Sequence, residues 1–572
     1  MPTEVQAESM PGRTREEDAL LARVNRVICD LDLTPDDIGE IAQGLKKELN
    51  QALHTGQSSQ IPSFVSCVPA GSELGTYLAV DLGGTNCRVS LVHLKGDSTF
   101  SMRQTKCTIP KSHMVNASHV PLFDFIAENI ARLLADDETH RTDSTSARND
   151  ANAAPEILKL GFTFSFTFAN QTLGSGTMLQ WDKGWDIADA VGRDPVQMLQ
   201  EAIDRLSLPV DVVAIISDSV GSLMARSYTS SIASDTLLAA IFGTGTNAAY
   251  FEHRANIHKV PLAPAERKDG VMIMNTEWGA WADSGHNALK FQTAYDRTLD
   301  QQSSNPGKQL LEKCISGLYL GEVVRLIIVE ILGHGLFTMR PAGPFSAVYN
   351  PYAVDTILLS HLASDQEEGL SLSREAIAEH FGVSNVSYSD ACAVRSIAAG
   401  VVKRSAFLAG AAMGAIILQS GRLPTSYLEF PCKDSTTLGM QEMHEHDSQG
   451  LKQSDMQIKN QRLTCVIGGI LGNVAHTICA LFGRPFPFLW TGMLAPRRPP
   501  LPAKLKTQKS IDIGIEGSLA EAYPGFEDHL RKALRDVPGI GVDGESCINI
   551  GVSRDGPILG AALAAHSAAV SE

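Results

Sequence analysis

The sequence predicts an α/β protein with two related domains. Two stretches support this prediction, because each combines an apolar strand, a turn of Gly and Thr, and a return strand. The first covers residues 78–92 with its turn at 81–86, and the second covers residues 237–251 with its turn at 243–247. The pattern therefore occurs twice, about 160 residues apart, in a chain of 572 residues that is long enough for two domains. Two such units suit a nucleotide held between two related domains.

The first turn, Asp81 to Asn86, has the chemistry of a phosphate site. Glycine lets backbone N–H groups approach an anion without a Cβ in the way, and the Thr and Asn side chains can donate to the same oxygens. Asp81, at the end of a buried strand, suits a hydrated Mg²⁺ beside phosphates. An ordinary β-hairpin with a Gly-Gly turn is the alternative. No G-x-x-x-x-G-K-[ST] motif occurs, and the second turn lacks the third glycine of a dinucleotide site.

Composition narrows the class of protein. The apolar content of 44% and charged content of 20% are ordinary for a globular chain. A net charge of −16 argues against nucleic acid as a direct partner, because phosphate backbones need a basic face. The ten cysteines include no C-x-x-C pair, which indicates reduced thiols and a cytoplasmic location. The N-terminal stretch has no apolar core, so we expect no secretory signal.

The first half of the chain alternates helices and strands. We expect disorder over residues 1 to about 17, and a helix that starts at Thr34-Pro35 with an N-cap and a first-turn proline. A helix over 122–134 and a polar, mobile loop over 136–154 follow.

Two later strands end in polar residues. The strands at 157–166 and 210–216 end near Ser165 and at Ser217-Asp218-Ser219, where open α/β sheets bind ligands. Asp218 is alternatively the N-cap of the helix that follows. Residues 312–331 are expected to form one long helix, and Glu277 and Glu312 are acidic residues in apolar settings, which need a partner.

The second half of the chain contains a segment whose composition differs from that of its neighbours. An Ala-rich helix over 397–418 precedes residues 423–507, which include the cluster 443–447 (Met-His-Glu-His-Asp), an apolar run at 466–482 and a Pro-rich stretch. The cluster is better interpreted as a solvated loop than as a metal site. The apolar run is short for a membrane span and contains polar residues, so a core or partner-binding helix or an unspliced intron remain open. A helix of small residues around 560–563 follows.

Together these motifs resemble the hexokinase family, with most similarity to fungal members, from about Leu20 to Ser567 apart from 423–507. The matching pieces occur in order and cover Ile61–Val65, Asp81–Arg88, Leu160–Phe166, Asp218–Gly221, Gly243–Asn247, Asn275–Ala280, Glu312-Lys313, and Gly317, Tyr319, Gly321 and Glu322. The resemblance implies two actin-like (ribonuclease-H-like) domains with an interdomain cleft. Its implied boundaries are 1–75 and 220–554 for the large domain, including the insertion, and 76–219 and 555–572 for the small domain.

The resemblance also implies roles for individual residues. Asp218 would be the general base that takes the proton from the sugar's 6-hydroxyl, and Lys183 would stabilise the transferring phosphoryl group. Sugar hydroxyls would be held at Ser165, Asp182, Ser217, Asn247, Glu277 and Glu312. ATP would be bound, with Mg²⁺ held through ATP and water near Asp81 rather than by direct ligands, by Asp81, Gly83, Gly84, Thr85, Asn86, Arg88, Gly243, Thr244, Gly245, Thr246, Gly514, Gly517, Ser518, Asp555 and Gly556.

Several ligand-facing positions depart from the family pattern. Asp182 replaces the usual Thr before the catalytic Lys, and Ser217 replaces the usual Asn before the catalytic Asp. An extra carboxylate near the phosphoryl path opposes incoming negative charge, and the serine removes a donor–acceptor pair. Glu516 replaces Asp, a modest change. Pro557-Ile558 replaces Ser-Gly, which would introduce strain if the lost glycine had a positive φ.

Three functions are compatible with this pattern. We expect a protein that binds hexose (glucose) and ATP, with weak or lost 6-phosphotransferase activity and a regulatory, carbon-sensing role through a protein partner. The alternative is an active hexokinase that makes hexose 6-phosphate for glycolysis. A degenerate paralogue with neither role ranks last. A sensor would be cytoplasmic and could also be nuclear.

Overall fold

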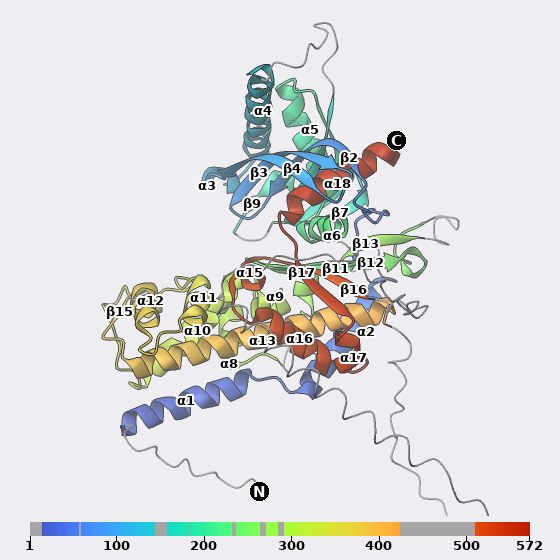
Figure 1. Ribbon diagram of the computed structural model, residues 1–572. Coiled ribbons are helices and arrows are strands. Elements are labelled where there is room, and N and C mark those ends of the chain that lie inside the picture. The colour runs from blue at the N-terminus through green and yellow to red at the C-terminus, as the bar shows by residue number, and fades with distance from the viewer. Residues whose placement is uncertain are drawn as a thin grey trace, which may run out of the picture. The chain divides into compact units, whose positions relative to one another are not determined.

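The computed structural model describes residues 14–55, 59–143, 157–181, 184–230, 236–262, 270–283, 291–423 and 510–571. All of them belong to one compact unit, Met1–Glu429 with Gln508–Glu572. Their strands form two principal sheets, each covered by helices (Figure 1). This agrees with the α/β class that the sequence predicts.

The first sheet has five strands, in the order β10-β6-β2-β3-β4. β6 runs parallel to both β2 and β10, whereas β2, β3 and β4 form an antiparallel meander. The bounds are β2 Leu74–Leu82, β3 Asn86–Lys95, β4 Phe100–Thr108, β6 Leu158–Phe164 and β10 Val210–Ile216.

Helices cover both faces of this sheet, because its buried strands are apolar on both sides. One core joins the sheet to α4 and α5, and the other joins it to α6 and α18 (Figure 1). The second core also contains Ala239, Phe251 and Ile273 of the second sheet, so α6 and α18 pack in a core shared by the two sheets. The bounds are α4 Val120–Asp143, α5 Pro195–Arg205, α6 Asp218–Thr229 and α18 Gly556–Ser571.

The second sheet has six strands, in the order β1-β13-β12-β11-β16-β17. β11, β16 and β17 are parallel, and β11, β12 and β13 are antiparallel neighbours. The bounds are β1 Ile61–Pro62, β11 Thr236–Phe242, β12 Thr246–His253, β13 Val271–Asn275, β16 Ile511–Glu516 and β17 Ile548–Val552.

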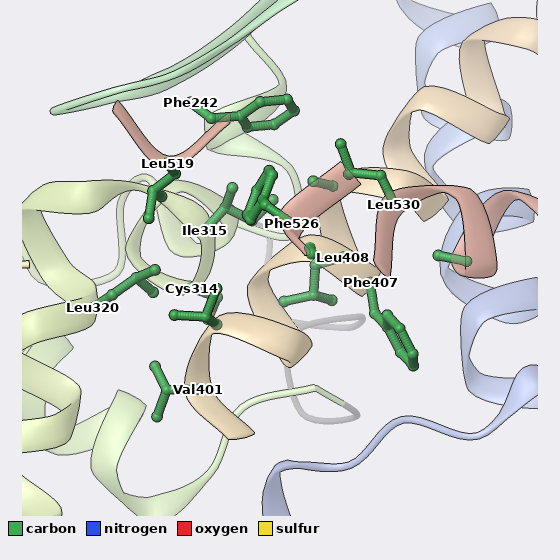
Figure 2. Close-up of a cluster of buried hydrophobic side chains, with 14 of the residues drawn as sticks. Phe242, Cys314, Ile315, Leu320, Val401, Phe407, Leu408, Leu519, Phe526 and Leu530 are labelled. Atoms are coloured by element: carbon green, nitrogen blue, oxygen red, sulfur yellow. The ribbon is translucent and has the colours of Figure 1, made fainter. Parts of the chain in front are cut away.

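Buried side chains of the second sheet and of the helices that cover it form one large hydrophobic core. Figure 2 shows Phe242 from β11 above Phe526 of α16, with the ring centroids 5.4 Å apart, and Leu408 of α13 below them. The main helices here are α1 Arg15–Leu31, α2 Pro35–Ala52, α9 Leu310–Ile315, α10 Gly317–Gly333, α13 Tyr388–Ser420 and α16 Phe526–Asp536.

The remaining elements are short and lie around these two layers. They are α3 Lys111–Met114, α8 Ala294–Gln302, α11 Ile357–Ser364, α12 Ser371–Phe381, α15 Ser518–Ala522, α17 Gly541–Glu545, η1 Ala188–Ala190, η3 Arg254–Asn256, η4 Trp278–Ala280, η6 Ala347–Tyr349, β5 Val115–Asn116, β7 Thr167–Thr172, β8 Ser175–Gln180, β9 Asp186–Ile187, β14 Arg340–Pro341 and β15 Val383–Ser384.

Most sequence-predicted elements are present, and three expectations are wrong. α4 runs to Asp143, so residues 136–143 are helical and not part of the loop expected over 136–154, because a polar segment can continue a helix whose earlier turns are packed. α1 begins at Arg15, inside the stretch expected to be disordered, because Thr14 and Glu17 form a capping box. The long helix expected over 312–331 is two helices, α9 and α10, separated by Ser316 in an extended conformation. Residues 1–13, 144–156 and 424–509, with most of the predicted insertion, lie outside the described residues.

α13 is long and apolar enough to cross a membrane by length and composition, and most of that apolar stretch is buried inside the fold. Small residues let other elements approach it closely: a Cβ at Gly410 would lie 2.8 Å from the backbone oxygen of Leu530 in α16. This is the packing of a core helix.

Candidate active site

Sequence-predicted site residues gather where parallel strands end. β2, β6 and β10 run in the same direction, so their carboxyl ends meet at one edge of the first sheet. Asp81 lies at the end of β2, Ser165 follows β6, and Ser217-Asp218 follows β10. The Ser165 N–H donates to the Leu82 carbonyl at 3.2 Å, which fixes two of these segments to each other. This edge is the expected position for ligands in an α/β sheet.

The second sheet has a corresponding edge. β11, β16 and β17 are parallel, and they end at the Gly243 turn, at Glu516-Gly517 and at Val552. Gly517 has φ 110°, and a Cβ there would lie 2.5 Å from the Phe242 carbonyl, so only glycine fits beside the end of β11. The predicted nucleoside stretch therefore lies directly beside the second turn.

The first turn is held by charge and by its own hairpin. Arg88 of β3 donates from Nε to Asp81 Oδ2 at 2.8 Å, and the two side chains form an ion pair at 2.6 Å. Asp81 is only 5% exposed. Burial opposes the charge on Arg88, but the Asp81 carboxylate outweighs it and raises the pKa of Arg88. Trp185 Nε1 donates to the Gly84 carbonyl at 2.8 Å, and the Ile109 N–H donates to the Thr85 carbonyl at 3.0 Å.

The second turn is held by helices from elsewhere in the chain. The Gly317 N–H, at the start of α10, donates to the Gly243 carbonyl at 2.8 Å, and the Leu318 N–H donates to the Thr244 carbonyl at 3.2 Å. Glu312 of α9 accepts the buried Thr246 N–H at 3.1 Å. These bonds begin a new helix at Gly317, which explains why the expected long helix is divided.

A connected set of polar side chains contains three of the predicted sugar residues. Asn247 Nδ2 donates to Glu277 Oε1 at 3.0 Å and to Asn275 Oδ1 at 2.8 Å, and Asn275 Nδ2 donates to Glu277 Oε1 at 2.7 Å. Ser219 Oγ donates to Asn275 Oδ1 at 3.2 Å and lies 3.1 Å from Ser217 Oγ. Glu277 has φ 50°, an uncommon conformation for a non-glycine residue. The network carries fixed donors and acceptors from β12 and β13 to the start of α6.

The structure at the start of α6 shows that the N-cap suggested by the sequence, Asp218, is wrong. Ser217, not Asp218, is the N-cap, because its hydroxyl accepts the Val220 N–H at 3.4 Å. Asp218 is the first helical residue, and its Oδ1 accepts the Ser219 N–H at 2.7 Å. Ser217 is 7% exposed, with its hydroxyl occupied by α6. A carboxylate at the first turn of a helix is stabilised by the backbone N–H groups there.

The start of α18 corrects a second expectation. Ile558 is fully buried in the core shared with α6, and it is absent from the residues with positive φ. Pro557 lies in the first turn of α18, where a missing N–H costs little. The positive φ belongs to Asp555, at 54°, and Asp tolerates that conformation well. The Pro-Ile pair therefore introduces no strain of the kind expected.

The surroundings of Glu516 are more unusual than the modest Asp-to-Glu change in the sequence suggests. Its Oε2 accepts the Ser222 hydroxyl at 2.5 Å. Burial, with added repulsion from Asp218 and Asp81, raises the pKa of Glu516 to about 7, whereas the Ser222 bond and Arg88 act in the opposite direction. A carboxyl group that titrates near neutral pH beside the predicted base is a recognised mark of a functional site.

The oxygen donors at this edge are compatible with magnesium held through a nucleotide. Carboxylates are the ligands that Mg²⁺ prefers, and Asp81 lies beside the turn predicted to hold phosphates. Within the described ranges, no group of three or more His, Cys, Asp or Glu side chains is placed to hold a metal ion. Mg²⁺ here would take most of its ligands from phosphates and water.

Two predicted residues cannot be placed, and several others were missed. Asp182 and Lys183 lie outside the described residues. The sequence assigned no role to Asn275, Ser222 or Trp185, although Asn275 ends a buried strand, as Ser217 follows one. That shared position at a strand end was the available signal.

Comparisons with known proteins agree with this architecture. Two hexokinase family models match residues 23–228 and 237–567. The chain is 35% identical to a protein named glucokinase from Aspergillus niger, over 94% of this chain and 93% of the relative. It is 30% identical to glucokinase-1 of Saccharomyces cerevisiae, over 96% of this chain and 97% of the relative.

A solved structure also matches the fold of this chain over nearly its whole length. A hexokinase from Schistosoma mansoni complexed with glucose matches at a TM-score of 0.71 and 25% identity, covering 97% of this chain and 99% of that one. Two sheets whose strand ends carry the two turns, together with family matches that span nearly the whole chain, lead to one conclusion: this protein belongs to the hexokinase family.

Proposed function

We propose that the protein binds a hexose and ATP, transfers the γ-phosphoryl group to the sugar's 6-hydroxyl slowly, and acts as a carbon-sensing regulator. The observation that carries the proposal is the network from Asn247 and Glu277 through Asn275 to Ser219 at the start of α6, because it brings predicted sugar-binding groups to the residue beside the predicted base. Two relatives named glucokinase make glucose the first sugar to test.

The chain's own residues have distinct parts in this proposal. The Glu277 and Glu312 carboxylates accept hydrogen bonds from sugar hydroxyls and orient the ring, and Asp218 accepts the proton of the attacking hydroxyl. Alignment and charge neutralisation supply most of the catalysis in phosphoryl transfer. Bound Mg²⁺ would neutralise charge on the ATP phosphates.

Slow transfer is proposed from three positions. Ser217 has its hydroxyl engaged by α6 and lacks the amide that the family usually presents to sugar. Glu516 keeps a carboxyl where the family pattern has Asp, and this carboxyl has a raised pKa near Asp81 and Asp218. By sequence, Asp182 adds an acidic group next to Lys183. Negative charge at either position opposes an incoming triphosphate.

The second candidate is an active hexokinase that makes hexose 6-phosphate for glycolysis. The completeness of the Asn247–Asn275–Glu277 network favours it, since every amide and carboxylate of that network is present and hydrogen-bonded. The two candidates differ in rate rather than in ligand.

A coupled assay with purified protein, glucose and MgATP separates them. We expect a turnover well below ~10 s⁻¹, a common value for enzymes. A turnover above that value would establish the active kinase instead. The double variant Asp182→Thr/Ser217→Asn is expected to raise turnover at least tenfold, and an unchanged rate with unchanged glucose affinity would place the cause elsewhere.

Sensing requires that sugar binding changes the protein. Trp185 and Trp278 donate to the first and second turns respectively, so Trp fluorescence reports on both. We expect glucose to change the emission even where turnover is slow, and no change at saturating glucose would contradict a sensor. A regulatory partner and a cytoplasmic location, with the nucleus as the alternative, belong to the same proposal, and fractionation with and without glucose tests the location.

A further inference from the structure

Glu516 connects the second sheet to the helix that carries the predicted base. It is the last residue of β16, and its carboxyl accepts the Ser222 hydroxyl at 2.5 Å. Ser222 lies four residues after Asp218 on α6, so the two side chains share one face of the helix. The contact therefore reaches α6 one turn beyond Asp218.

The length of the Glu516 side chain suits this contact. Gly556, at the start of α18, leaves room on the other side, since a Cβ there would meet both Glu516 Oε2 and the Ser222 hydroxyl, the latter at 2.6 Å. The carboxyl thus lies between α6 and the first turn of α18. An aspartate on the same backbone is shorter by one methylene, about 1.5 Å, which exceeds the tolerance of a hydrogen bond.

Charged groups surround this carboxyl on several elements. Arg88 of β3 is the cation that lowers its pKa, and Asp218 of α6 and Asp81 of β2 are the carboxylates that raise it. Asp555, which precedes Gly556, acts on the same Arg88. Farther along α6, Arg226 is paired with Asp512 at 2.5 Å. One guanidinium therefore serves several carboxylates at the predicted phosphate turn.

We propose that Glu516 is a positioning residue with a second, electrostatic effect: it holds α6 through Ser222, and its carboxylate form weakens binding of a nucleoside triphosphate at the Asp81 turn. This inference rests on the proposed function, since it requires ATP at that turn. Because burial and nearby carboxylates raise the pKa of Glu516 to about 7, the neutral form dominates below pH 7 and the repulsive form above it.

The test is the pH dependence of MgATP affinity between pH 6 and pH 8.5, measured calorimetrically with the full chain and glucose present. We expect the dissociation constant of the unaltered protein to rise about fivefold more than that of Glu516→Gln, in keeping with one added charge in a partly screened site. The amide keeps an acceptor for Ser222, so the variant isolates the charge. Titration of ATP itself affects both proteins equally.

Ser222→Ala is the matched variant, because it removes the bond and keeps the charge. It should retain the pH dependence, with a midpoint shifted to higher pH, since the Ser222 bond lowers the pKa of Glu516. Turnover should fall by a similar factor in Ser222→Ala and in Glu516→Asp, with little further loss in the double variant. Fully additive losses would contradict the bridging role.

The outcomes distinguish failure of this inference from failure of the proposed function. ATP affinity with the same pH dependence in the unaltered protein and Glu516→Gln overturns the electrostatic effect alone, and the proposed function stands. Failure to bind ATP at every pH overturns the proposed function and this inference with it. Glucose affinity, measured in parallel by fluorescence, should be the same in all variants and shows that each one is folded.

Discussion

The two glycine turns share a sequence pattern and differ in what holds them. The turn after Asp81 is supported by an ion pair within its own hairpin and by Trp185. The turn after Phe242 is supported by Glu312 of α9 and by the first N–H groups of α10, from residues about 70 positions later. The first turn is thus organised by charge, and the second by helix ends and backbone.

This difference matches the two tasks proposed for the turns, phosphate binding at the first and sugar binding at the second. Asp81, Arg88 and Glu516 form a charged environment of the kind that responds to a polyphosphate and to pH. The second turn is tied to Glu312, and Asn247 at its end enters the hydrogen-bonded network of β12 and β13, which suits a neutral polyol. Variants that affect one turn and spare the other therefore test whether the two tasks are separate.

The largest expected effect comes from Arg88→Met. This change leaves the buried Asp81 carboxylate without its guanidinium, and removing one partner of such a pair should lower the free energy of unfolding by about 2–4 kcal/mol. Urea unfolding measures it. The double variant Asp81→Asn/Arg88→Met removes both charges and should recover at least half of the loss. Wild-type stability in Arg88→Met would show that the pair does not organise the first turn.

An intermediate effect is expected for Glu312→Ala. It leaves the buried Thr246 N–H without its acceptor, which should cost about 1–3 kcal/mol of unfolding free energy. Glu312→Gln keeps an oxygen acceptor and should cost less than half as much, while both variants weaken glucose binding. Urea unfolding and fluorescence titration are the measurements. Equal stability of the two variants would mean that charge, rather than the backbone bond, supports the second turn.

The smallest effect compares alanine substitutions in the two turns. A Cβ at Gly245 would lie 2.8 Å from Glu312 Oε2, whereas a Cβ at Gly83 would lie 3.6 Å from the Asn86 carbonyl, an ordinary contact. Gly245→Ala should therefore lower the unfolding free energy by about 1 kcal/mol, and Gly83→Ala by less than about 0.5 kcal/mol. Thermal unfolding of both proteins checks this. The reverse order would indicate that the first turn is the more tightly packed of the two.

Local signals in the sequence located most of the framework. The helix that starts at Pro35, the strand over 210–216 and both hairpins agree with the structure, because their caps, turns and apolar patterns act within a few residues. Contacts between distant residues were not predictable. The division of the helix at Ser316 depends on a carbonyl of Gly243, and the role of Glu516 depends on Ser222, nearly 300 residues earlier.

The sequence indicated which residues lie at the site, but it did not indicate most of their hydrogen-bond partners. Strand ends indicated Ser165, Ser217 and Asp218, but the N-cap was assigned to the wrong residue, since Ser and Asp at adjacent positions cap equally well. A positive φ was expected at Ile558, but the residue that has one is Asp555, three positions earlier. The assigned roles of Ser165, Asn247, Glu277, Glu312 and the nucleotide residues remain predictions, as do the domain boundaries.

The placement of α18 has a consequence for how the chain matures on the ribosome. A Cβ at Gly161 would overlap the Ala561 carbonyl, so α18 packs directly against β6. That helix begins about 340 residues after β10 ends, a delay of roughly 20–70 s at ordinary rates of synthesis. The first sheet is translated early, yet the face that α6 and α18 cover together lacks α18 until residues 556–571 have been made. Proteins truncated before Gly556 should therefore need chaperones and be degraded rapidly.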